Sequence, residues 1–280
     1  MSHPLRDSRL ACAALVLLLA TLSGCSLFHR GGAKGNPMDT MTVEQLYEQG
    51  ADALKFGNYD LATRAFTRLI ARFPFGAYTE QSQLNLAYAQ YKNDKPDDAY
   101  STINRFIKTY PTNQYADYAY YLRGLINFDR SSGFLTSYIG SDSTQRDLAF
   151  VRQSFDDFGS LVKRYPDSRY AVDGRQRMIY LRNLLAKSEL NVAFYYLRRG
   201  AYVASANRAK SIVETYPRAP EVGDALAIMI VSYDKLGQKK LAEGAESVLK
   251  LNYPNHPFFA GGWPHYRSTW WKLLPLAARG

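Results

Sequence analysis

The chain of 280 residues carries 35 Lys and Arg residues against 25 Asp and Glu residues, and 46% of its residues are hydrophobic. This composition is typical of a folded protein and excludes a disordered or collagen-like chain. Two cysteines are too few for a disulfide scaffold or a four-cysteine zinc module. The net charge of +10 is compatible with nucleic acid, anionic lipid or an acidic protein surface as a partner.

The first residues have the parts of a secretory signal. Arg6 and Arg9 precede an uncharged apolar run over residues 10–22, which is shorter than the roughly 20 residues that span a bilayer. The run ends in Leu-Ser-Gly-Cys at residues 22–25, which matches the bacterial lipoprotein signal. In lipoproteins of that kind the peptidase cuts before the cysteine, which then carries the lipid. We therefore expect residues 1–24 to be a signal peptide and Cys25 to be the lipidated residue.

Cleavage at this point changes the number of cysteines and the net charge of the mature chain. Cys25 becomes its one cysteine, the charge becomes +9, and several acyl chains on Cys25 would anchor the protein firmly. Ser26 resembles the outer-membrane class of these lipoproteins, since Asp at that position is typical of inner-membrane retention. Residues 25–41 are rich in Gly and polar residues, which predicts a flexible tether. We expect no cofactor other than the covalent lipid.

An aromatic residue followed by proline recurs five times in the rest of the chain. The pairs begin at Phe73, Tyr110, Tyr165, Tyr216 and Tyr253, with spacings of 37, 55, 51 and 37 residues. Apolar residues at helical spacing precede each pair, and proline ends a helix because it has no N–H to donate. This pattern predicts two-helix units at about 42–75, 77–111, 113–166, 168–217 and 219–254, with insertions of 18 and 14 residues.

A two-helix unit of this length resembles the tetratricopeptide repeat. Leu46, Gly50, Ala62 and Phe66 stand at signature offsets of that repeat; the small residues let helices approach closely, and we expect Phe66 to pack against the neighbouring unit. The resemblance implies an all-α, superhelical array of about five helix pairs over residues 42–254.

The insertions and the C-terminal segment depart from the regular unit. Residues 130–145 are rich in Gly and Ser and predict a loop within the third unit, with Phe134, Leu135 and Tyr138 exposed. The second insertion, near residues 184–199, is helical in character and predicts an extra helix between units. Residues 255–280 form an aromatic tail, which we expect to fold back as a cap over the last repeat.

The sequence gives no support for an enzyme. The histidines of the mature chain lie in the tether and the tail, so the repeat region lacks the imidazole needed for a Ser-His-Asp or Cys-His arrangement. It also lacks a glycine-rich phosphate loop and a nucleophile elbow. A non-catalytic scaffold fits better, because stacked helix pairs commonly bind extended peptides and the positive charge favours acidic partners.

Several segments resemble the BamD family of outer-membrane β-barrel assembly lipoproteins, also called competence lipoproteins in some bacteria. They are residues 72–78 (RFPFGAY), 91–93 (YKN), 105–107 (RFI), 123–125 (RGL), 155–158 (FDDF) and 199–202 (RGAY) with Asn207 and Arg208. The similarity runs from the lipoprotein signal through the fifth unit. The tail departs from the shortest members of the family, so no family role is assigned to it.

This resemblance implies a scaffold on the periplasmic face of the outer membrane. Its implied partners are the periplasmic POTRA region of the BamA barrel protein, the small lipoproteins BamC and BamE, and unfolded outer-membrane β-barrel proteins with a C-terminal signal. Phe73 is the implied contact for that signal, with Phe75 and Tyr78 beside it and Arg105 for its negative charge. Arg208 is implied in coupling to BamA.

A different function remains open at this point. The chain is alternatively a periplasmic repeat lipoprotein that engages peptidoglycan, a secretin or the DNA-uptake machinery. We do not expect nucleic acid as a partner, because a periplasmic location makes it rare and the sequence lacks the basic and aromatic strands of an oligonucleotide-binding fold.

Overall fold

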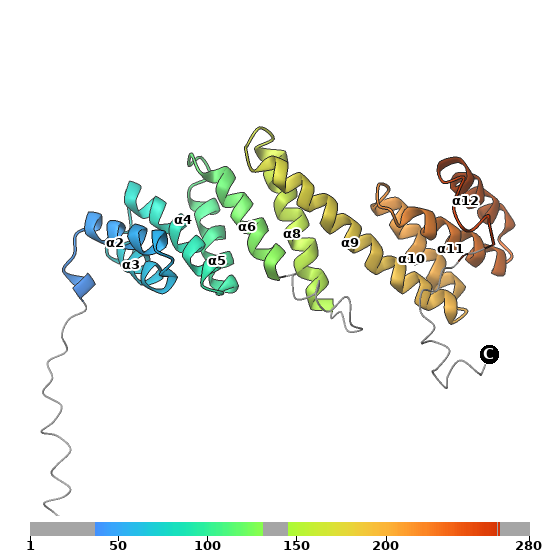
Figure 1. Cartoon of the computed structure of the whole chain (residues 1–280), viewed down its shortest axis with the longest axis horizontal. Helices are drawn as coiled ribbons and strands as arrows, with labels where there is room; N and C mark the ends of the chain where they lie inside the picture. Colours follow the sequence, from blue (N-terminus) through green and yellow to red (C-terminus); the bar gives the residue numbers. More distant parts are fainter. Residues whose placement is uncertain (1–36, 131–144, 262, 264–280) are drawn as a thin grey trace, which may run out of the picture. The chain divides into compact units, whose positions relative to one another are not determined.

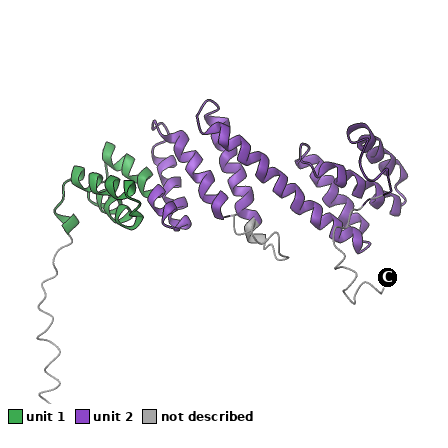
Figure 2. Ribbon diagram, in the orientation of Figure 1, with its two compact units in different colours: residues 1–86 green, residues 87–280 purple. Residues whose placement is uncertain are grey.

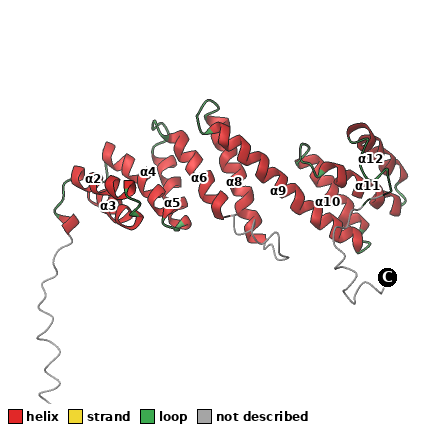
Figure 3. Ribbon diagram, in the orientation of Figure 1, coloured by secondary structure: helices red, strands yellow, loops and turns green. Residues whose placement is uncertain are grey.

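The computed structural model describes residues 37–130 and 145–261 together with Trp263, and within them every regular element is a helix (Figures 1 and 3). The elements are η1 (Pro37–Asp39), α2 (Val43–Lys55), α3 (Tyr59–Arg72), α4 (Ala77–Lys92), α5 (Pro96–Thr109), α6 (Ala116–Arg130), α8 (Gln145–Arg164), α9 (Ala171–Arg198), α10 (Tyr202–Thr215), α11 (Val222–Lys235) and α12 (Lys239–Asn252). This confirms the predicted all-α fold of paired helices. In this part of the chain, no helix combines the length and the apolar character needed to cross a membrane.

The five aromatic residues that precede proline each close a helix. The backbone N–H of each donates to the carbonyl four residues earlier, at 2.8 Å in all five cases: Phe73, Tyr110, Tyr165, Tyr216 and Tyr253. The proline that follows cannot donate the next bond of the series. The helices α3, α5, α8, α10 and α12 therefore end where the sequence pattern places their ends.

The turns inside the helix pairs need a left-handed residue. Gly57, Gly200 and Gly237 have φ angles of 71–72°, and each lies between two paired helices. Asp94 has a φ angle of 54° in the corresponding turn between α4 and α5. Glycine takes this conformation without steric penalty, and Asp is among the few other residues that tolerate it.

The chain divides into two compact units, residues 1–86 and 87–280, and the boundary falls inside α4 (Figure 2). In the first unit α2 packs on α3 around Leu46, Ala65 and Leu69. Phe66 packs against Gly50 within the same helix pair, since a β-carbon at 50 would lie 2.6 Å from its ring. This contact lies within one helix pair, and the expected packing of Phe66 against the neighbouring unit stays a prediction.

The end of the predicted tether is part of this first unit. Met38 is buried in the core between α2 and α3, and Arg72 Nη1 donates to the carbonyls of Met38 and Met41 at 2.9 and 2.8 Å. Asp39 forms an ion pair with Arg68. The prediction of a free tether was wrong for residues 37–41, because an apolar side chain and two carbonyls find partners on α3. Residues 25–36 lie outside the described part.

Two hydrophobic cores of the second unit share one helix. One core lies among α6, α8 and the first half of α9, and the other among the second half of α9 and helices α10–α12. α9 is continuous over 28 residues, so the predicted extra helix is wrong: the inserted residues lengthen α9. No Gly or Pro interrupts residues 184–199, and the added turns allow α9 to contribute to both cores.

The first residues of the tail fold back on the second core. Phe258 and Trp263 pack against it, and the Trp263 ring centroid lies 5.6 Å from that of Phe194 on α9. Trp263 Nε1 donates a hydrogen bond to Asp224 on α11 at 2.5 Å, and His256 Nε2 lies 3.4 Å from the same carboxylate. These contacts agree with the predicted cap, while residues 264–280 lie outside the described part, as do Phe134, Leu135 and Tyr138 of the inserted loop.

Candidate functional site

The turn between α3 and α4 presents the predicted signal-binding residues. Phe75 is 89% exposed, although it lies in an ordered turn. Thr79 Oγ1 donates to the carbonyls of both Phe73 and Phe75, and Gly76 takes a φ angle of 112° that allows the chain to enter α4. The turn therefore holds a large apolar side chain in solvent at a fixed position, which reduces the entropy lost when a partner binds it.

Phe73 and Tyr78 differ from Phe75 in their surroundings. Phe73 is half-buried, packs against the core around Met38 and lies under the guanidinium of Arg72 at 5.0 Å. Tyr78 is 41% exposed, and its ring centroid lies 5.2 Å from that of Tyr47 on α2. The structure thus brings all three predicted aromatic residues to one turn, with Phe75 as the most accessible of them.

Arg105 and Arg208 lie in the second unit, on different helices. Arg105 is an exposed residue of α5. Arg208 on α10 forms an ion pair with Glu189 on α9, with Nη1 2.9 Å from Oε2. Arg152 on α8 binds the other oxygen of Glu189 at 3.3 Å. Glu189 therefore links three helices, and the Arg208 side chain, which is 50% exposed, is positioned by this carboxylate.

Sequence reasoning missed a buried ionic cluster between α6 and α8. Arg123 Nε lies 2.8 Å from Oδ1 of Asp157, and Asn127 Nδ2 donates to Oδ2 at 2.7 Å. Burial raises the pKa of Asp157, although Arg123, Asn127 and Gln153 act against this shift. Because Arg123 and Asp157 stand 34 residues apart, only the packing of two helices reveals their pairing.

A second missed feature is a set of tyrosines bonded to carboxylates. Tyr121 donates to Asp173 at 2.8 Å, and Arg177 Nε donates to the same oxygen at 2.6 Å. Tyr91 donates to Asp129. Burial, together with the carboxylate partner, raises the pKa of Tyr91 and Tyr121, so both hydroxyls stay protonated as donors. These tyrosines fix neighbouring helices to one another.

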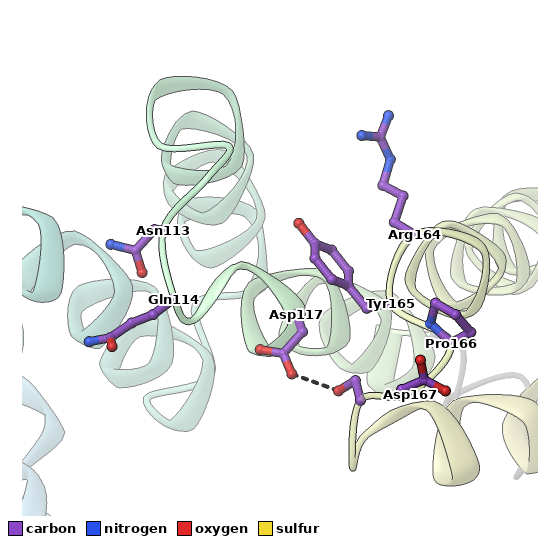
Figure 4. A pocket seen from close by; sticks show the side chains of 8 residues that line it. Asn113, Gln114, Asp117, Arg164, Tyr165, Pro166 and Asp167 are labelled. Carbon is purple, nitrogen blue, oxygen red and sulfur yellow. Dashed lines mark hydrogen bonds between the residues drawn. The ribbon is translucent and has the colours of Figure 1, made fainter.

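A polar cleft of about 410 Å³ lies where the turn before α6 meets the turn between α8 and α9 (Figure 4). Its lining residues are Asn113, Gln114, Asp117, Arg164, Tyr165, Pro166, Asp167 and Ser168. Asp117 accepts a hydrogen bond from Ser168 at 2.6 Å, which joins the two turns. We therefore assign the bond between Asp117 and Ser168 a role in packing the two turns against each other.

Within the described ranges, no group of three or more His, Cys, Asp and Glu side chains is arranged to hold a metal ion. Cys25, the predicted lipid acceptor, precedes these ranges.

Residues 39–249 match the family described as "YfiO: Outer membrane lipoprotein". Proteins called outer membrane protein assembly factor BamD are similar over most of their length. The one from Xylella fastidiosa (strain 9a5c) is 47% identical over 94% of this chain and 90% of its own. Those from Neisseria meningitidis serogroup A and Vibrio cholerae are 40% and 36% identical, over 82% and 85% of this chain and 86% and 96% of theirs.

The chain belongs to the BamD (YfiO) family of outer-membrane lipoproteins. The matched span includes the turn with Phe73, Phe75 and Tyr78, and it includes Arg105 and Arg208. Among solved structures, the TPR2AB domain of yeast Sti1 in complex with pHSP90 is 13% identical, with a TM-score of 0.40 over 77% of this chain and 79% of its own. Membership of the BamD family therefore rests on sequence.

Proposed function

We propose that this chain is a non-enzymatic scaffold for outer-membrane protein assembly, tethered to the periplasmic face of the outer membrane by lipid on Cys25. The relatives named outer membrane protein assembly factor support the role in assembly. The proposed partners are the POTRA region of BamA, the lipoproteins BamC and BamE, and unfolded β-barrel proteins. No cofactor takes part in this function.

The exposed Phe75 carries the proposal that the first unit recognises the C-terminal signal of an unfolded barrel protein. An aromatic side chain that is 89% exposed on an ordered turn has most of its apolar surface available for a partner. Tyr78 adds a half-exposed ring beside it, and the buried part of Phe73 holds the turn in place. Arg105, on α5 of the second unit, is proposed separately from this turn as a cation for the carboxylate of the signal.

Phe56 offers a matched control for Phe75. It is 80% exposed and lies in the same unit, at the turn between α2 and α3. We would measure binding of a fluorescently labelled C-terminal peptide of a β-barrel protein by fluorescence anisotropy, with the full-length chain solubilised in detergent. Phe75→Ala should weaken binding at least tenfold, as truncation of a central interface aromatic does. Phe56→Ala should leave affinity within about twofold.

The outcome that contradicts this assignment is equal affinity of the two variants. Thermal unfolding of both variants provides the second readout, since neither side chain contributes much to the core. Scaffold function itself is tested separately by co-purification of BamA from detergent-solubilised outer membranes. The anchor is tested by Cys25→Ser, which should release the protein from the membrane fraction.

A further inference from the structure

An apolar groove runs between α8 and α9 in the second unit. It has a volume of about 300 Å³ and is lined by Phe155, Val162, Arg175, Met178, Ile179 and Arg182. Phe155 and Val162 come from α8, and the other four residues come from α9. Ile179 is 52% exposed, so a large aliphatic side chain of this groove faces solvent.

Gly159 of α8 lies beside Met178, one of the residues that line the groove. A β-carbon at this position would approach only Cε of Met178, at 3.5 Å, which is an ordinary van der Waals contact. At Gly124, in contrast, a β-carbon would lie 2.6 Å from the ring of Phe158. A glycine inside a helix is about 0.5–1 kcal/mol less stable than alanine. The packing of α8 on α9 therefore does not require glycine at 159.

Two arginines of α9, Arg175 and Arg182, are among the residues that line the groove. Arg175 Nη1 donates to the carbonyl of Pro166 at 3.4 Å, and Arg182 donates to Oδ1 of Asn183 at 2.9 and 3.1 Å. Within the described part of the chain, neither guanidinium forms an ion pair with a carboxylate. The two residues are seven positions apart on one helix, so their α-carbons are separated by about 10 Å along its axis.

We propose that this groove binds an acidic amphipathic helix of a partner protein. A bulky apolar side chain of that helix would lie over Gly159 and Met178, and carboxylates two turns apart would pair with Arg175 and Arg182. Complementary charge favours this occupant, because each arginine can bind a carboxylate through two donors. A helix laid in an apolar groove between two others is a common mode of recognition.

This proposal deepens the scaffold role and rests on it, because it requires a protein partner. It concerns a surface of the second unit and does not involve the turn at Phe75. The partner is therefore expected to bind here independently of the C-terminal signal of an unfolded barrel protein.

Photo-crosslinking in the bacterial envelope tests the proposal with the full-length chain. A photoreactive phenylalanine analogue replaces Val172, which is 57% exposed on α9 one turn before Arg175, so the groove stays intact. The control position is Leu251, which is 83% exposed on α12. We expect an adduct from position 172 whose mapped peptide contains an apolar residue between carboxylates, and no such adduct from position 251.

Two further pairs of variants identify the contacts. Arg175→Glu with Arg182→Glu should reduce the adduct at least tenfold, while lysine at both positions should retain most of it. Gly159→Leu should fill the groove and reduce the adduct at least tenfold, while Gly244→Leu, at a glycine of α12 with open space around it, should not. Thermal unfolding of each variant verifies that it is folded.

The proposal is overturned by an adduct with lipid, by a mapped peptide without carboxylates, by equal adducts from both positions, or by no adduct at all. An adduct that survives the glutamate substitutions also overturns it. Co-purification of BamA is measured in parallel. If BamA still co-purifies but no adduct forms, the result contradicts only the proposal for the groove. If BamA does not co-purify with the unmodified chain, the result contradicts the scaffold function.

Discussion

The ring of Phe158 occupies the space that a β-carbon on Gly124 would need, with only 2.6 Å between that ideal atom and Cε1 of the ring. The same relationship joins Phe66 to Gly50 in the first unit. In each case a glycine of the first helix in a pair accepts an aromatic ring from the second helix. The two helices can approach closely because one of them has no side chain at this point.

Replacing Gly124 by alanine should therefore destabilise the protein, although alanine is the better helix former. Overpacking a buried contact of this kind typically costs about 1–3 kcal/mol, which should appear in urea unfolding as a lower midpoint. Gly244→Ala is the matched control, because nothing lies within 4 Å of a β-carbon at 244. It should raise stability by about 0.5–1 kcal/mol. A neutral Gly124→Ala would show that the ring moves aside easily.

Arg208 allows a test that separates partner binding from structure. Because its ion pair with Glu189 is half-exposed, Arg208→Met should change the free energy of unfolding by about 1 kcal/mol or less. In our proposal Arg208→Glu greatly reduces co-purification of BamA, whereas Glu189→Gln, which keeps the guanidinium, retains it. If Glu189→Gln and Arg208→Met impair co-purification equally, Arg208 serves mainly to hold Glu189.

The folded-back tail should stabilise the last helix pair. Truncation after Asn255 removes Phe258 and Trp263 from the core around α9 and α11, and it removes the hydrogen bond to Asp224. Burial of two partly buried aromatic side chains is worth about 2–3 kcal/mol, so the thermal midpoint should fall by roughly 5–10 °C. Truncation after Trp263 is the control, because it keeps both side chains, and its midpoint should be higher than that of the truncation after Asn255. Equal midpoints for the two truncations would exclude the capping role.

The buried Asp157 should give the unfolding free energy a recognisable pH dependence. Its pKa is raised above 3.8 in the folded protein, so the folded state retains a proton that the unfolded state has already released. The stabilising contribution is complete below about pH 4 and is lost as the pH rises through the folded-state pKa. Over that window, stability should fall with pH more in the wild type than in Asp157→Asn, as measured by urea unfolding at a series of pH values. A steeper fall in the variant would contradict the shift.

Helix ends could be predicted from the sequence because proline acts locally. At Tyr165-Pro166, for example, the missing N–H ends α8 whatever lies around it. The length of α9 was not predicted, because a fixed repeat length suggested that the helix ends within residues 184–199. That segment has no Gly or Pro that would end a helix there. The docking of Met38 was also missed, because composition describes a segment and not the pocket into which one of its side chains fits.

The predicted site shows the same division between local and long-range information. Phe73 and Phe75 are two positions apart in one motif, yet one is half-buried against Met38 and the other is 89% exposed. Only tertiary packing distinguishes them. Similarly, the partner of Arg208 lies on another helix 19 residues away, and neither the helical periodicity nor the repeat pattern indicates Glu189.

Arg72 holds the carbonyls of Met38 and Met41 against α3 of the first unit. Twelve residue steps separate Pro37 from Cys25, and a chain of that length extends for at most about 40 Å. In the proposed lipid-anchored protein, this segment sets the largest possible distance between the lipid on Cys25 and the first unit. Arg72 adjoins Phe73 in sequence, so in that proposal the same length limits how far from the bilayer the exposed ring of Phe75 can lie.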